Sequence, residues 1–250
     1  MSSALTETSK YIIFPLMATV IGAFIALRKQ PSSQTKSLVR HIAAGLVFAA
    51  ATVELLPGLL KDKQPLATIV GFAFGVGLLL LVNVLLGGHY HGDKDEAEDH
   101  QHVDGESGSV LSTMMAAIGI DVAVDGLLVG IGFATGVSEG RLLTLALSVE
   151  VLFISLSIVA SCKERRQTIG RTLTMAISPG IILAVFALVG ASIFATLHGA
   201  LHQAVLAFGI AALLYLVTEE LLVEAHDTPD EPIEAVGFFA GFLLVLVLAL

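Results

Sequence analysis

The chain has 250 residues, of which 55% are hydrophobic and only 14% are charged, and its mean hydropathy is +0.87. Because charged residues make up about a quarter of an ordinary soluble domain, this composition indicates a membrane protein. Acidic residues outnumber basic ones, and no basic stripe is present, which excludes nucleic acid as an expected partner. The single cysteine, Cys162, excludes an intrachain disulfide and a cysteine-based metal cluster within one subunit.

The apolar residues fall in long blocks, which predict an all-α polytopic protein embedded in a lipid bilayer through about eight transmembrane helices. The predicted spans are Tyr11–Leu27, Leu38–Leu60, Leu66–Leu86, Val110–Val137, Leu142–Cys162, Leu173–Leu197, Ala200–Val223 and Ile233–Leu250. The connections are short except for Gly87–Ser109, which is hydrophilic and rich in His, Asp and Glu. The polar start of the chain lacks the basic region of a cleavable signal peptide.

Basic residues flank the spans unevenly, and this asymmetry predicts the orientation of the chain. Lys and Arg concentrate in cytoplasmic loops of membrane proteins. The first and fifth loops hold most of them, namely Arg28, Lys29, Lys36, Arg40, Lys163, Arg165, Arg166 and Arg171. We therefore expect the first, third and fifth loops in the cytoplasm and both termini outside. A plasma-membrane location is a separate expectation.

Two aspartates, Asp121 and Asp125, lie one helical turn apart inside the otherwise uncharged stretch Val110–Val137, and Glu150 lies in the middle of the next span. An ionised carboxylate in the hydrocarbon core costs on the order of 2.5–3.5 kcal/mol on insertion scales, and the two aspartates share one helical face. These acids predict an intramembrane cation site. Protonated carboxyls that hydrogen-bond between helices, or a proton relay, are the alternatives.

The predicted site offers oxygen ligands alone, because no histidine lies in the fourth or fifth span. Ser148, Ser178, a backbone carbonyl or water would complete the coordination. Oxygen ligands suit Mn²⁺, Mg²⁺ or Ca²⁺, although carboxylates also bind Zn²⁺ and Fe²⁺.

A second group of candidate ligands lies near the end of the seventh span. Its members, Glu219, Glu220, Glu224 and His226, would form an entrance, an exit relay or an auxiliary metal site, or an interfacial acidic cap without a ligand. Glu54 in the second span is a further candidate ligand, because it corresponds to Glu220 in the internal repeat described below. A solvated charge at a helix end is the alternative for Glu54. We expect a cation arriving from outside to pass near both Glu54 and Glu220.

The long hydrophilic loop carries two His-x-His pairs among its acids, and we expect it to be disordered. The pairs are His89, His91, His100 and His102. Such pairs bind transition metals weakly, which suggests cytosolic buffering or sensing; a merely hydrophilic linker is the alternative.

An internal repeat is visible at a constant offset of 166 residues. Glu54-Leu55-Leu56 matches Glu220-Leu221-Leu222, and Gly71-Phe72 with Gly75 matches Gly237-Phe238 with Gly241. If spans one to three repeat as spans six to eight, the copies cross the membrane in opposite directions, as in many secondary transporters. This predicts a 3+2+3 inverted repeat with a first repeat at 1–87, a cytoplasmic loop at 88–109, a central metal-site element at 110–166 and a second repeat at 167–250.

Several spans together resemble the ZIP (Zrt/Irt-like) family of divalent-metal transporters. The motifs are His41-x-x-Ala44-Gly45 and Glu54-Leu55-Leu56-Pro57 in the second span, Glu219-Glu220-Leu221-Leu222 to Glu224 in the seventh, and Gly241-Phe242 in the eighth. The resemblance implies the eight-helix fold, the His-rich loop, both termini outside and a homodimer.

The metal-site positions depart from the family pattern. Where the family has His-Asn-x-x-Glu-Gly on the fourth helix, this chain has Asp121-Val122-Ala123-Val124-Asp125-Gly126. On the fifth helix Glu150 takes the leading His position, while Phe153, Ile154 and Ser155 replace Pro, Glu and Gly; on the sixth, Ser178-Pro179 replaces a Glu-Pro pair.

The chain is therefore interpreted as a transporter of divalent metal cations (Zn²⁺, Mn²⁺, Fe²⁺ or similar) toward the cytoplasm. A non-transporting membrane metal sensor or receptor that keeps the transporter fold is the alternative. A third class, an intramembrane enzyme, is disfavoured because no His-Glu-x-x-His motif, Ser/His pair or nucleotide loop is present. No resident cofactor is expected.

Overall fold

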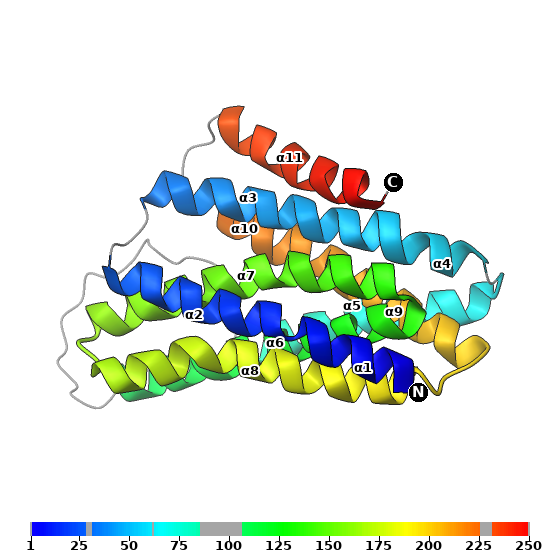
Figure 1. The fold of residues 1–250 in the computed structure, drawn as a ribbon, viewed down its shortest axis with the longest axis horizontal. Coiled ribbons are helices and arrows are strands. Elements are labelled where there is room, and N and C mark those ends of the chain that lie inside the picture. The colour runs from blue at the N-terminus through cyan, green and yellow to red at the C-terminus, as the bar shows by residue number, and fades with distance from the viewer. Residues whose placement is uncertain (1, 29–31, 62, 86–106, 226–231, 250) are drawn as a thin grey trace.

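The computed structural model describes residues 2–28, 32–61, 63–85, 107–225 and 232–249, and every regular element within these ranges is a helix (Figure 1). The all-α class predicted from the sequence is thus confirmed. The elements are α1 (Ser2–Tyr11), α2 (Ile13–Arg28), α3 (Ser33–Ala49), η1 (Ala50–Leu55), α4 (Leu56–Lys61), α5 (Pro65–Leu85), α6 (Ser107–Thr135), α7 (Val137–Glu164), α8 (Ile169–Phe194), α9 (Ala200–Tyr215), η2 (Leu216–Leu221), α10 (Leu222–Ala225) and α11 (Pro232–Ala249).

Seven stretches of the described chain are long and apolar enough to cross a membrane, which confirms a polytopic membrane protein. The eighth predicted span corresponds to α11, whose described apolar part, Ala235–Ala249, is shorter. The first stretch begins at Ser3 and not at Tyr11, because the polar N-terminal segment is helical as well. Thr8 on this segment is fully buried, and the ring of Tyr11 lies 5.5 Å from the ring of Phe133 on α6.

Both termini lie at the same end of the bundle, at the right-hand side of Figure 1. The α7–α8 turn and the start of α3 lie at the opposite end. Termini on one side are what an even number of membrane crossings requires. Which end faces the cytoplasm stays a prediction.

Two π-helices interrupt the second and the seventh predicted spans at equivalent places. The first, Ala50–Leu55, and the second, Leu216–Leu221, are separated by the same 166 residues that relate the sequence repeats. Each contains the repeated glutamate, Glu54 or Glu220. A π-helix inserts an extra residue into a helical turn and is frequently found at functional sites.

Close contacts between helices follow the same repeat. A methyl group at Gly71 on α5 would overlap the backbone of Ala204 on α9, and one at Gly237 on α11 would lie 2.8 Å from Leu38 on α3. Leu38 and Ala204 are themselves separated by 166 residues. These two contacts lie at positions related by the offset of the sequence repeat. The 3+2+3 inverted arrangement and its domain boundaries stay predictions.

The helices pack most extensively in four pairs, α6 with α8, α2 with α7, α3 with α11, and α5 with α9. Further contacts join α2, α6, α7 and α8 into one group. Two of these helices, α6 and α7, carry the three intramembrane acids.

Candidate metal centre

The helix α6 is held against α8 by glycines that let the two backbones approach. A methyl group at Gly126 would lie 2.6 Å from the carbonyl oxygen of Leu183, and one at Gly130 would overlap the backbone of Gly190 and Ala191. Small residues at such contacts are a usual packing device between membrane helices. This packing fixes the rotation of α6 about its axis, and with it the direction in which Asp121 and Asp125 project.

The helix α7 is held against α2 by a glycine contact and a buried hydrogen bond. A methyl at Gly22 would overlap the carbonyl oxygen of Leu152, and the hydroxyl of Ser155 donates to the carbonyl oxygen of Thr19 at 2.8 Å. Ser155 is completely buried. These contacts lie little more than one turn beyond Glu150 on α7, so they fix the position of that side chain.

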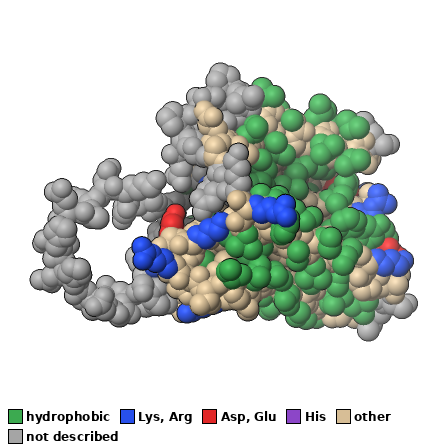
Figure 2. Space-filling model, turned by 60° about the vertical axis from the view of Figure 1, so that its left-hand side comes forward, with side chains coloured by type: hydrophobic (Ala, Val, Ile, Leu, Met, Phe, Trp, Pro, Cys, Tyr) green, Lys and Arg blue, Asp and Glu red, His purple; other side chains and the backbone are tan. Residues whose placement is uncertain are grey.

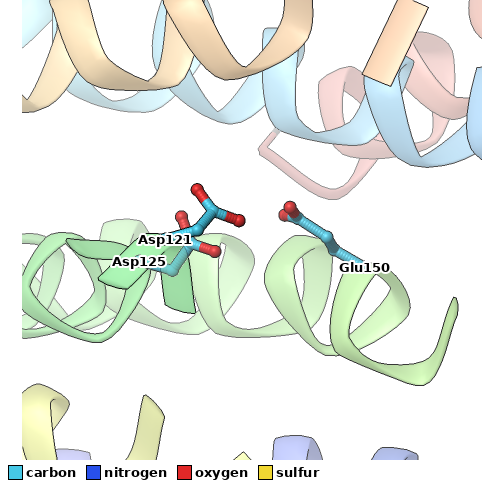
Figure 3. A group of neighbouring side chains, drawn as sticks. All are labelled: Asp121, Asp125 and Glu150. Carbon is cyan, nitrogen blue, oxygen red and sulfur yellow. The ribbon is translucent and has the colours of Figure 1, made fainter. Parts of the chain in front are cut away.

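Asp121, Asp125 and Glu150 come together between α6 and α7, as the sequence predicts (Figure 3). One carboxylate oxygen from each residue lies within 4.8 Å of those of the other two. Asp125 is 2% exposed and Glu150 3% exposed, whereas Asp121 is half-buried. We call these three residues the acidic triad.

Three carboxylates at this separation repel one another strongly when all are ionised, and burial strengthens the repulsion. A divalent cation among them would remove most of this repulsion, and their oxygens would supply its ligands. Protons would also reduce it. No histidine or cysteine of the described part of the chain joins these three acids.

The hydroxyls predicted to complete the coordination are bonded to their own helices. Ser148 donates to the carbonyl oxygen of Thr144 at 2.6 Å, and Ser178 donates to that of Met175 at 2.9 Å. A donating hydroxyl still has oxygen lone pairs to offer a metal, so their role as ligands stays a prediction. Val122, beside Asp121 in sequence, is fully buried.

The remaining candidates do not join the triad in the described part of the chain. Glu54 is half-buried on η1, and Glu219 is exposed on η2. The side chains of Glu220 and Glu224 lie outside the described residues, as do His226, His89, His91, His100 and His102. The elements that follow η1 and η2, α4 and α10, lie toward opposite ends of the bundle (Figure 1). The route of a cation past Glu54 and Glu220 stays a prediction.

Glu139 is an acid near Glu54 that the sequence analysis does not single out. It lies in the first turn of α7, and its carboxylate interacts electrostatically with that of Glu54. Glu139 lies in the short connection between the fourth and fifth predicted spans. That connection is on the same predicted side of the membrane as the end of the second span, and this position could have indicated that Glu139 lies near Glu54.

Comparison with known proteins finds a similar metal transporter. No family model matches the chain. The chain is similar to Zinc transporter ZIPB of Bordetella bronchiseptica, with 27% identity over 245 residues. The alignment covers 92% of this chain and 76% of that relative. This similarity confirms the family resemblance drawn from the motifs.

Proposed function

We propose that this chain, a ZIP-family protein by its relationship to a zinc transporter, carries a divalent metal cation across the membrane toward the cytoplasm. The cation would bind to the acidic triad between α6 and α7. The observation that carries the proposal is the convergence of three carboxylates, two of them almost fully buried, from two apolar helices. A membrane protein retains such costly charges where they bind or move ions.

The cation itself is proposed from the ligands. Six carboxylate oxygens and a formal charge of −3 suit a divalent ion better than a monovalent one. The similarity to a zinc transporter supports Zn²⁺ as a candidate, and carboxylates also bind Mn²⁺ and Fe²⁺. We propose no resident cofactor; the metal is the cargo.

The internal repeat suggests how the acidic triad could be reached by the cation from both sides of the membrane in turn. The group α2, α6, α7 and α8 carries the triad, and η1 and η2 introduce irregular turns into the helices that neighbour it. We propose that the triad is exposed alternately to the two sides as the helix groups shift. Glu54 would lie on the outer route, and Glu219 and Glu220 on the inner one.

Uptake into proteoliposomes tests this function. Wild-type protein should take up at least one of Mn²⁺, Fe²⁺, Co²⁺, Zn²⁺ and Cd²⁺ with saturable kinetics. Glu150→Gln should lower that uptake by on the order of a hundredfold, equivalent to about 2.7 kcal/mol, because a neutral amide replaces one of the charged groups that would bind the ion. The matched control is Glu164→Gln, which changes an exposed acid on the same helix and should leave uptake unchanged.

The sensor is the second candidate function, and the apolar Val122 and Ile154 at positions of the family's metal motifs favour it. A sensor would bind metal at the triad without uptake of any ion. Equilibrium dialysis on the same preparation separates the two functions. Binding that Glu150→Gln weakens, together with no uptake by wild type, would replace the transporter with the sensor.

A further inference from the structure

Five basic side chains gather where α2 ends and α7 turns into α8, and we propose that this basic patch binds the phosphate headgroup of an anionic phospholipid. All five residues are exposed: Arg28, Lys163, Arg165, Arg166 and Arg171. Figure 2 turns this end of the bundle forward and shows Lys and Arg side chains at the border of the apolar surface. The proposal is independent of the metal and of the transport step.

The patch is held together by a lysine that joins two helix ends. Lys163 near the end of α7 donates to the carbonyl oxygens of Ala26 at 2.6 Å and Leu27 at 3.0 Å, in the last turn of α2. The last carbonyls of a helix have no partner within the helix, so this lysine satisfies two of them. The contact places Arg28 beside the α7–α8 turn, which carries Arg165 and Arg166.

Arg28 fixes the depth of the patch in the bilayer. Its guanidinium carbon lies 4.3 Å from the centre of the Phe24 ring, which is 54% exposed on the apolar surface. An exposed phenylalanine in a membrane helix faces lipid chains, whereas an arginine beside it reaches the charged boundary. The patch thus lies at the level of lipid phosphates, and this position favours a lipid headgroup over a soluble anion.

The start of α8 adds to the positive field. Its N-cap residue, Thr168, makes no side-chain capping hydrogen bond, and the first turn contains Arg171 and no acid. Acids are the side chains usually favoured there, since the helix dipole is positive at its N-terminus. Within residues 163–171 the acidic residue is Glu164, so the basic charges dominate. An anion bound from the membrane would balance them.

Native mass spectrometry of the full chain in detergent, with added phosphatidylglycerol or phosphatidylcholine, tests the proposal. Wild type should retain phosphatidylglycerol several-fold better than phosphatidylcholine. Each basic residue near an anionic surface contributes about fivefold in affinity, so the pair Arg166→Gly with Arg171→Gln should lose on the order of twentyfold. The matched control is Lys61→Gln with Lys63→Gln, two exposed lysines near the end of α4, at the opposite end of the bundle from the patch (Figure 1). A lipid bound at the patch lies well beyond the screening length of about 10 Å from these lysines, so the control should change retention by less than about twofold.

The variants are chosen so that misfolding does not imitate the expected loss. Arg166 has a φ of 52°, the left-handed region that favours glycine, so Arg166→Gly suits the backbone. That single variant should melt no lower than wild type and still lose about fivefold in phosphatidylglycerol retention. Equal retention of both lipids by wild type, or equal losses in patch and control variants, would overturn the proposal. Displacement by inorganic phosphate, but not by chloride at matched ionic strength, would also overturn it in favour of a soluble anion.

Discussion

Asp125 shows how a single side chain identifies this centre. It is 2% exposed, lies in a helix of apolar residues, and shares its surroundings with two more carboxylates. The sequence alone predicts the triad, because Asp121 and Asp125 share a helical face and Glu150 is the acid in the middle of the next span. For Glu54 and Glu139 the sequence indicates only that both lie on the same predicted side of the membrane; their interaction depends on how the second span lies against the start of α7.

Asp121 is the position at which we expect metal preference to be adjustable. Asp121→His replaces a carboxylate oxygen by an imidazole nitrogen, which favours Zn²⁺ and Cd²⁺ over Mn²⁺. The ratio of Zn²⁺ to Mn²⁺ uptake should rise on the order of tenfold, equivalent to about 1.4 kcal/mol. Competition between the two ions in proteoliposomes measures it. A ratio equal to that of wild type would show that Asp121 does not contact the ion.

The helices themselves follow directly from the apolar blocks of the sequence, whereas their irregularities do not. The sequence of the second span, which contains η1, predicts one uninterrupted α-helix, because a π-helix adds a residue to a turn without a composition of its own. Hydrophobic periodicity cannot register that addition. The polar start of the chain was likewise not expected to extend the first span, since the burial of Thr8 depends on distant helices.

Glycine substitutions test how closely the helices α5 and α9 pack. Gly71→Ala would force a methyl group into the backbone of Ala204, and we expect a loss of about 1–3 kcal/mol in stability. Gly77→Ala on the same helix meets no atom within 4 Å and should be neutral or stabilising by up to about 1 kcal/mol. Thermal unfolding in detergent compares the two variants. Equal melting temperatures would show that α5 and α9 do not pack as closely as described.

The whole molecule combines a repeat visible in sequence with a packing that only the structure displays. The matches at an offset of 166 residues predict which helices correspond, but not that α3 packs on α11 while α5 packs on α9. Pairing between the two halves requires coordinates, because apolar faces that contact lipid and those that contact helices have similar compositions.

Labelling of single cysteines tests the topology. Ser3 in the first turn of α1 and Gly170 in the first turn of α8 are both exposed, and these two helices begin at opposite ends of the bundle (Figure 1). In sealed vesicles, an impermeant maleimide should label either Ser3→Cys or Gly170→Cys from outside, but not both. The native Cys162 is fully buried and should contribute only a slow background. Labelling of both positions from one side would contradict the predicted crossing pattern.

The acidic triad as the binding site of the transported ion is the central claim, and uptake of a panel of divalent ions tests it most directly. Wild type and Asp121→Asn with Asp125→Asn are reconstituted side by side, with Glu164→Gln as the control. We predict saturable uptake of at least one ion by wild type and by the control, and its loss in the double variant, which inserts normally. Unchanged uptake kinetics in the double variant would contradict the account.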